Sequence, residues 1–164
     1  MRLVILGCGR VGSMLAALMT REGHDVTIID TNPSAFRRLP SGFSGNTVVG
    51  TGIDQECLQR SGIEQADGFV AVTNGDNRNI MAAQMARHVF HVPKVIARIY
   101  DPIRAQAYQE LGIDTLCSTA IGSGVLQDYF LGRPFRSIEQ YIGLCDLIAR
   151  SVHGGQAERE GEGA

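Results

Sequence analysis

With 164 residues, the chain has the length of a single domain that can bury a full hydrophobic core. Its composition, with 44% hydrophobic and 20% charged residues, is that of an ordinary globular protein. The net charge of −2 argues against a protein built mainly to neutralise the phosphates of DNA or RNA, so no nucleic-acid partner is expected.

Six short apolar runs with the length of β-strands alternate along the chain with segments of helical periodicity. Several runs are apolar without alternation, which is typical of strands that are buried on both faces of a sheet. The regular β–α alternation predicts an α/β fold, namely a Rossmann-like, doubly wound parallel sheet of six strands. The expected strands are residues 3–6, 26–29, 47–49, 69–72, 95–99 and 115–117.

Five helices are expected to connect these strands. The second has Pro33 in its first turn, where proline is favoured, and the third has Asp54 as N-cap and Gly62 as its stop. The fourth occupies residues 76–90 and the fifth residues 101–112. The first helix has apolar residues in the series i, i+3, i+4, i+7 and i+8, namely Val11, Met14, Leu15, Leu18 and Met19.

From residue 121 onwards the pattern changes to two consecutive helices. The second is expected over roughly residues 137–152 and has a broad apolar stripe. This stripe can fold back on the sheet or form a subunit interface, and its width favours the interface. The expected organisation is a Rossmann-like domain over residues 1–133, a dimerisation helix over residues 134–152 and a disordered tail over residues 153–164.

The four cysteines, Cys8, Cys57, Cys117 and Cys145, are widely spaced and include no C-x-x-C pair. Neither a disulfide framework nor a metal site is predicted, because the histidines also lack partners at ligand spacing. No apolar run approaches the ~18 residues of a membrane span. Because the first strand starts beside Met1 and leaves no room for a signal peptide, a cytoplasmic protein is expected.

The sequence LGCGRVG, residues 6–12, places the pattern G-x-G-x-x-G between the first strand and the first helix. Gly7 permits the sharp turn, Gly9 lets the backbone approach a diphosphate, and Gly12 allows the helix and strand to pack closely. The helix N-terminus then offers N–H groups and a partial positive charge to an anion. The motif therefore predicts a nucleotide-binding site.

Two other side chains of this turn leave alternatives open. Arg10 can meet a phosphate or point into solvent. Cys8 lies beside the predicted phosphate site, but without a nearby base it is interpreted as a bystander thiol rather than a redox switch.

Asp30 ends the second strand, near the spacing from Gly7 at which an acid accepts hydrogen bonds from ribose hydroxyls. An acid here disfavours a 2′-phosphate, so NADP is not expected, and Arg37 and Arg38 are assigned to a solvated helix face. Asp30 does not separate NAD from ATP or ADP, because all three carry the same adenosine ribose.

Three further loops follow strands at the same edge, where ligands bind in open α/β sheets. Thr51 and Gly52 could border the adenine, and Thr73 and Asn74 could reach the ribose or the phosphates. Arg98 could add a second phosphate contact.

Two longer stretches are more specific than the glycine pattern: ADGFVAVTNGDNRN at residues 66–79 and VIARIYDP at residues 95–102. Together with LGCGRVG, IID, VVGTGIDQ and YQELGID, they resemble the regulator of potassium conductance family. This is the RCK or KTN domain (TrkA-N family) of Trk- and Ktr-type potassium uptake systems. The resemblance covers roughly residues 1–130, and the two C-terminal helices suit the crossover and dimerisation helices of the family.

The resemblance implies a cytoplasmic gating subunit that binds NAD(H) or ATP/ADP, with no catalytic residues and no metal. Such subunits form homodimers, and rings of dimers, at the inner face of the cell membrane beneath a membrane-embedded potassium channel or transporter subunit. Carried over by position, the nucleotide contacts are Gly7, Cys8, Gly9, Arg10, Val11, Gly12, Asp30, Thr31, Thr51, Gly52, Thr73, Asn74 and Arg98.

Two departures from the family pattern bear on this hypothesis. Thr51 stands where the family usually has Asp, which affects the preference on the adenine side. Many members also carry a second subdomain or a tandem copy, so the chain can be a fragment or a regulator with one ligand site. The alternative functions are a small NAD-dependent oxidoreductase, which needs an acid or base for hydride transfer, and a redox-sensing DNA-binding regulator, which needs a helix-turn-helix.

Overall fold

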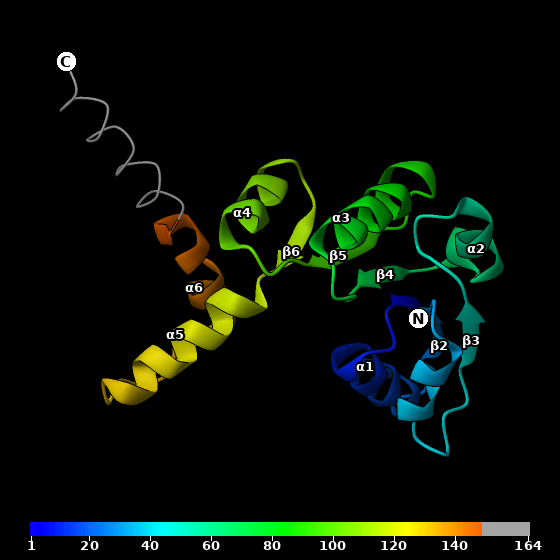
Figure 1. Ribbon diagram of the computed structural model, residues 1–164, viewed down its shortest axis with the longest axis horizontal. Helices are drawn as coiled ribbons and strands as arrows, with labels where there is room; N and C mark the ends of the chain where they lie inside the picture. The colour runs from blue at the N-terminus through cyan, green and yellow to red at the C-terminus, as the bar shows by residue number, and fades with distance from the viewer. Residues whose placement is uncertain (149–164) are drawn as a thin grey trace. The chain divides into compact units, whose positions relative to one another are not determined.

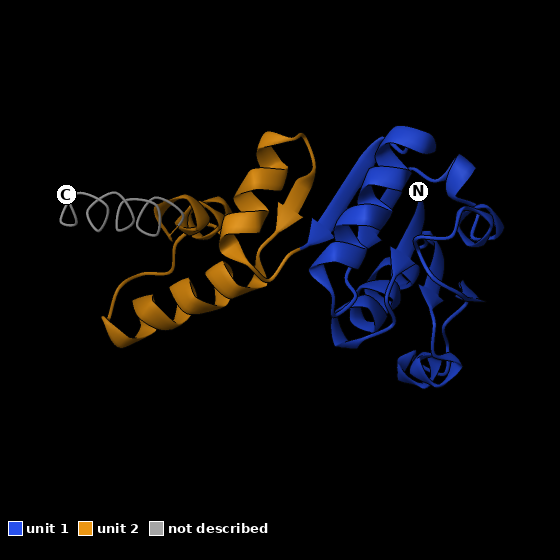
Figure 2. Ribbon diagram, turned by 45° about the horizontal axis from the view of Figure 1, so that its top comes forward, with its two compact units in different colours: residues 1–98 blue, residues 99–164 orange. Residues whose placement is uncertain are grey.

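The computed structural model describes residues 1–148. The chain divides into two compact units, and the boundary lies between Arg98 and Ile99 (Figure 2). This division by compactness differs from the organisation expected from the sequence, in which the first domain extends to residue 133. We refer to the two parts as unit 1 and unit 2 and describe each by itself.

Unit 1 contains the alternating strands and helices that the sequence pattern predicts (Figure 1). Every predicted strand of this unit is confirmed to within one or two residues at each end. The elements are β1 (Arg2–Leu6), α1 (Arg10–Arg21), β2 (Asp25–Asp30), η1 (Pro33–Arg38), β3 (Asn46–Val49), α2 (Gln55–Arg60), η2 (Ile63–Gln65), β4 (Gly68–Ala71), α3 (Asp76–Gln84), η3 (Met85–Val89) and β5 (Lys94–Arg98).

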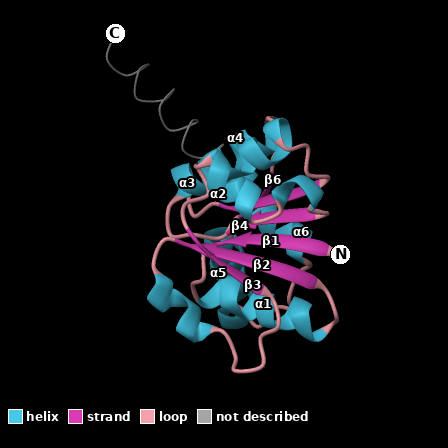
Figure 3. Cartoon of the chain, turned by 90° about the vertical axis from the view of Figure 1, so that its right-hand side faces the viewer, coloured by secondary structure: helices cyan, strands magenta, loops and turns pink. Residues whose placement is uncertain are grey.

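The strands of unit 1 form a sheet in the order β3-β2-β1-β4-β5. All four strand pairs within unit 1 are parallel, with Leu3 of β1 opposite Val26 of β2 and Gly68 of β4. Figure 3 shows α1 on one side of the strands and α2 and α3 on the other. The order reverses between β1 and β4, and the predicted doubly wound, Rossmann-like fold is thereby confirmed.

One core cluster of unit 1 lies on the side of the sheet that α1 and η1 cover, and buried residues such as Phe69 and Leu58 lie outside this cluster. The strands supply fully buried residues such as Ile5 and Ile28, and the helices add Ala16 and Ala35. Leu15, Met19 and three apolar residues around η1 pack against this cluster from its rim. The apolar runs of the sequence therefore form strands because both faces of the sheet are covered.

Helix α1 differs from the sequence expectation in the face that it buries. Its buried residues are Gly12, Ser13 and Ala16, whereas Val11, Met14 and Leu18 of the predicted apolar series are exposed. The reason is steric. The helix begins so close to the glycine turn that a side chain at Gly12 would collide with the carbonyl oxygen of Gly7, so only small residues fit against the sheet.

Two other predicted helices are modified. The second is a 3₁₀ helix, η1, in which the side chain of Asn32 accepts a hydrogen bond from the Ser34 N–H. The fourth begins at Asp76 as predicted but ends in a π-helical turn, η3. The chain then turns at His91, which has a φ of 54°, and enters β5.

Unit 2 contains α4 (Pro102–Glu110), β6 (Asp114–Leu116), α5 (Ser118–Phe130) and α6 (Ile138–Ile142). The predicted last strand and both C-terminal helices are present. The last helix is interrupted at Gly143 and continues over residues 144–148. The remainder of the predicted dimerisation helix and the predicted disordered tail lie outside the described residues.

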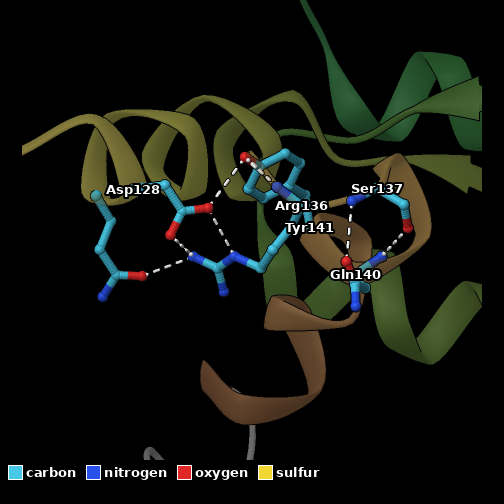
Figure 4. Close-up of polar contacts among 6 residues, drawn as sticks. Asp128, Arg136, Ser137, Gln140 and Tyr141 are labelled. Atoms are coloured by element: carbon cyan, nitrogen blue, oxygen red, sulfur yellow. Dashed lines mark hydrogen bonds and ion pairs between the residues drawn. The ribbon is translucent and has the colours of Figure 1, made fainter. Parts of the chain in front are cut away.

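A polar cluster joins α5 to the segment before α6 (Figure 4). The guanidinium of Arg136 donates from Nε and Nη2 to the two carboxylate oxygens of Asp128, at 2.8 and 2.9 Å. The hydroxyl of Tyr141 donates to the same carboxylate at 3.1 Å and accepts from the Arg136 N–H at 3.0 Å. A reciprocal capping pair between Ser137 and Gln140 then starts α6.

Candidate functional site

A cavity of about 350 Å³ opens at the carboxyl ends of the strands of unit 1. It is the position at which open α/β sheets bind ligands, because the strand order reverses there. Nine of the thirteen predicted site residues line it: Gly7, Cys8, Gly9, Asp30, Thr31, Thr51, Thr73, Asn74 and Arg98. The other four, Arg10, Val11, Gly12 and Gly52, do not.

The three motif glycines have different surroundings in this cavity. Gly7 has a φ of +104°, and a side chain there would meet the backbone of Thr73 at 3.0 Å. Gly12 has no room for a side chain, as described above. A Cβ atom on Gly9 would have no neighbour within 4 Å and faces open space. Gly7 and Gly12 thus shape the turn, whereas Gly9 leaves its backbone accessible from the cavity.

The N-terminus of α1 follows directly. Gly9 is the N-cap residue, so no side-chain hydrogen bond caps the helix, and its first turn contains no acidic residue. The first N–H groups of a helix have no partners within the helix itself. They and the partial positive charge of the helix end therefore favour an anion at the edge of the cavity.

Asp30 ends β2 beside the glycine turn. One carboxylate oxygen accepts from the Cys8 N–H at 2.7 Å, and the other accepts from the Asn32 N–H at 2.9 Å. The side chain therefore fixes the glycine turn and the loop after β2 relative to each other. This structural role was not evident from the sequence, which indicated only a ligand contact for Asp30.

Asn79 was missed by the sequence analysis and organises the loop after β4. Its fully buried side-chain oxygen accepts from the N–H and the hydroxyl of Thr73, at 2.9 and 2.7 Å. Its NH₂ group donates to the carbonyls of Thr73 and Arg98, at 3.1 and 2.8 Å. Arg98 in turn donates from Nη2 to the carbonyls of Val72 and Thr73. The sequence carries no signal for this role, because the burial of Asn79 and its partners become evident only in the structure.

The arginines that line the cavity differ in part from those predicted. Arg98 lines the cavity and also donates to the Thr73 carbonyl, whereas Arg10 lines a different hollow beside α1. Besides Arg98, two arginines that were not predicted as contacts line the cavity: Arg38 at the end of η1 and Arg78 in the first turn of α3. With Asp30, they give the cavity a positive balance that suits an anionic ligand.

The surroundings of Gly52 and of the Cys8 thiol differ from those expected of direct ligand contacts. Gly52 packs against Leu6, where a larger residue would collide with its side chain. The thiol of Cys8 is buried and lies 3.4 Å from the Ala35 carbonyl oxygen, to which it donates. Burial raises the pKa of Cys8, the Asp30 carboxylate raises it further, and Arg38 opposes both. A neutral, buried thiol agrees with the interpretation of Cys8 as a bystander.

Comparison with protein families decides the relationship. Residues 3–119 match the model of the TrkA-N domain. The chain belongs to the TrkA-N domain family. It is 54% identical over 118 residues to the Trk system potassium uptake protein TrkA of Streptomyces coelicolor. These aligned residues cover 72% of this chain and 53% of that protein. A TrkA homolog of Pyrococcus abyssi is 36% identical over 111 residues, covering 68% of this chain and 49% of its own length. The chain thus spans about half the length of these relatives.

Solved structures agree with the TrkA-N assignment. The TrkA-N domain of the Escherichia coli inner membrane protein YbaL superposes with a TM-score of 0.69 at 18% identity, covering 78% of this chain and 95% of that domain, and this shows the fold alone. The GsuK channel bound to NAD has a TM-score of 0.66 at 25% identity, covering 77% of this chain and 22% of the channel chain. No helix within residues 1–148 is long and apolar enough to cross a membrane.

Proposed function

We propose that this TrkA-N chain is a nucleotide-sensing regulatory part of a potassium uptake system and binds NAD(H) or ATP/ADP in the cavity of unit 1. The observation that carries the proposal is the convergence of an open Gly9, an uncapped helix N-terminus and Asp30 on one cavity. The first two features suit a diphosphate, and Asp30 suits the hydroxyls of an adenosine ribose.

In this arrangement the diphosphate lies against Gly9 and the start of α1, and the ribose lies beside Asp30. The base lies toward Thr31 and Thr51, which line the cavity after β2 and β3. A solved structure of similar fold, the GsuK channel, is described in NAD-bound and ADP-bound forms, which supports both classes of ligand for this chain.

A regulatory rather than catalytic role is supported by the cavity lining. A hydride-transfer enzyme needs a positioned acid or base such as His, Lys or Tyr. The ionisable residues that line this cavity are Asp30, Cys8 and three arginines. Arginine does not release its proton in proteins, the Cys8 thiol is buried, and both carboxylate oxygens of Asp30 accept backbone N–H groups. We therefore assign the site to ligand sensing.

The partner side of the proposal rests on unit 2. Helix α5 exposes Leu126, Tyr129 and Phe130, with 59%, 69% and 81% of their surface accessible. Apolar patches of this kind mark interfaces, and a two-fold copy of the same helix would cover them. We propose a homodimer, or a ring of dimers, that is cytoplasmic and attaches to a membrane-embedded potassium channel or transporter subunit at the inner face of the membrane.

Thermal unfolding with added nucleotide tests the sensing role. A ligand at 100 times its Kd stabilises the folded state by about 2.7 kcal/mol, which raises the Tm of a domain of this size by several degrees. We expect such a rise with at least one of NAD, NADH, ATP and ADP. Identical melting curves with all four would refute nucleotide sensing at this site.

Light scattering tests the dimer. Phe130→Glu places a charge in the exposed patch of α5 without disturbing a core residue, and we expect it to convert a dimer to a monomer. Leu111→Glu is the matched control, because Leu111 is similarly exposed in unit 2 but lies outside α5. A wild-type chain that stays monomeric at tens of micromolar would remove the basis for the dimer.

A further inference from the structure

Arg37 and Arg38 are adjacent in η1, yet the structure separates their roles. Both side chains are exposed, but only Arg38 lines the cavity that holds Asp30 and Thr31. From the sequence, both arginines were expected on a solvated helix face. Arg38 is exposed as expected, and its position at the last turn of η1 also places it at the wall of the cavity.

The guanidinium of Arg38 is available to a ligand. Within residues 1–148, the structure shows no hydrogen bond and no ion pair for its side chain, even though Asp30 lines the same cavity. A guanidinium has five N–H donors in a planar fork that matches the oxygens of a phosphate. Arg38 thus offers unused donors at the end of the cavity where the loop after β2 lies.

Asp30 is a weaker barrier to a phosphate than the sequence alone suggests. Its two carboxylate oxygens already accept the N–H groups of Cys8 and Asn32, so part of its negative charge is balanced by backbone dipoles. In doubly wound folds, the ribose lies beside the acid at the end of the second strand, and an arginine nearby accommodates a 2′-phosphate. Arg38, at the end of η1, lines the same cavity as Asp30.

We propose that Arg38 binds substituents at the 2′ position of the adenosine ribose, so that the site accepts 2′-phosphorylated adenosine ligands as well as unphosphorylated ones. This inference rests on the proposed nucleotide-binding function. It revises the sequence expectation that NADP is not bound, because that expectation assigned Arg38 to a solvated helix face and not to the wall of the cavity.

The test compares 5′-AMP with 2′,5′-ADP by calorimetry on the full chain. The two compounds differ only by the 2′-phosphate, so the ratio of their Kd values isolates its contribution. For the wild-type chain we expect 2′,5′-ADP to bind within about threefold of AMP. Arg38→Ala should shift the ratio against 2′,5′-ADP by about tenfold, the value of one charge-assisted contact.

Arg37→Ala is the matched control, since it removes the same charge from the neighbouring position without touching the cavity, and its ratio should equal that of the wild type. One such contact is worth about tenfold in Kd. A wild-type chain whose Kd for 2′,5′-ADP exceeds its Kd for AMP by more than about thirtyfold would therefore overturn the inference. Because AMP would still bind, the proposed function would stay intact. An unchanged ratio in Arg38→Ala would also overturn it. A wild-type chain that binds none of AMP, NADH, ATP and 2′,5′-ADP would refute the proposed function as well.

Discussion

Arg136 in unit 2 and Arg38 in unit 1 have opposite surroundings. Arg136 is held by both oxygens of the buried Asp128, by Gln127 and by the ring of Tyr141, 5.2 Å from its guanidinium carbon. Arg38 faces a cavity. A charge that is satisfied within the protein stabilises local structure, whereas a charge that faces a cavity is available to a ligand. The comparison predicts that changes at the cavity of unit 1 alter nucleotide binding, whereas changes in the cluster around Arg136 alter stability alone.

The largest effect is expected at Gly12, because a change there should lower both stability and nucleotide binding. Gly12→Ala forces a Cβ atom into the carbonyl oxygen of Gly7, so the turn must distort. We expect the free energy of unfolding to fall by about 3 kcal/mol, at the upper end for overpacking, together with loss of nucleotide binding. Denaturant unfolding and calorimetry measure the two effects.

Gly9→Ala is the matched control, because its Cβ atom meets no protein atom. Its stability should stay within about 0.5 kcal/mol of the wild type. Nucleotide binding should still fall, because the new methyl group occupies the space proposed for the diphosphate. If Gly12→Ala unfolds like the wild type, the close approach of α1 to the turn is wrong.

The next largest effect is expected at Asp30. Asp30→Ala removes the proposed ribose contact and should weaken nucleotide binding by roughly 1.5–3 kcal/mol. It should also lower stability, because the N–H groups of Cys8 and Asn32 lose their acceptor. Isothermal calorimetry gives the first quantity and thermal unfolding the second.

Asp25→Ala serves as the control at the other end of the same strand, where the side chain is exposed and away from the cavity. It should bind nucleotide like the wild type. Unchanged binding in Asp30→Ala would place the ribose elsewhere in the cavity.

These contrasts also show what could be predicted from the sequence. The strands and the glycine turn were predictable because they depend on local patterns: apolar runs, a G-x-G-x-x-G spacing and an acid at the end of β2. The roles of Asn79 and Arg38 were not, because they depend on which side chains converge across loops that are far apart in sequence. Asn79 joins Thr73 to Arg98, and no local pattern encodes that pairing.

Which face of α1 is buried could not be predicted for a related reason. Helical periodicity correctly located the helix, but the buried face was set by how closely the helix approaches the glycine turn. Small residues such as Ser13 and Ala16 therefore pack inward, whereas Met14 remains exposed. The interruption of the last helix at Gly143 likewise falls within a stripe that looked continuous.

A smaller effect is expected in unit 2 at Tyr141. Tyr141→Phe removes the hydroxyl that donates to Asp128 and accepts from the Arg136 N–H. We expect a loss of about 1 kcal/mol in the free energy of unfolding, with nucleotide binding unchanged. Tyr129→Phe is the control, because Tyr129 is exposed on α5. An altered nucleotide affinity in Tyr141→Phe would contradict the separation of roles between the units.

The smallest effect is expected on the stability that the Asp128–Arg136 pair contributes when the pH falls from 7 to 5. Hydrogen bonds from Arg136 lower the pKa of Asp128 below its usual range, and the Tyr141 hydroxyl lowers it further, against the opposing effect of burial. A carboxylate whose pKa is lowered by folding contributes stability that is fully present above its unfolded pKa, about 3.9, and is lost as the pH falls through the folded pKa.

The Asp128–Arg136 pair should therefore contribute equally at pH 7 and pH 5, and its contribution should decline only below about pH 4. Asp128→Asn supplies the reference, because an amide does not titrate. The difference in Tm between wild type and Asp128→Asn should stay constant from pH 7 to about pH 5 and shrink at lower pH, which also subtracts acid effects elsewhere in the chain. A difference that shrinks between pH 7 and pH 5 would mean that Asp128 titrates like an unpaired or apolar-buried carboxyl, and that the cluster does not hold α5 to the segment before α6 as the geometry indicates.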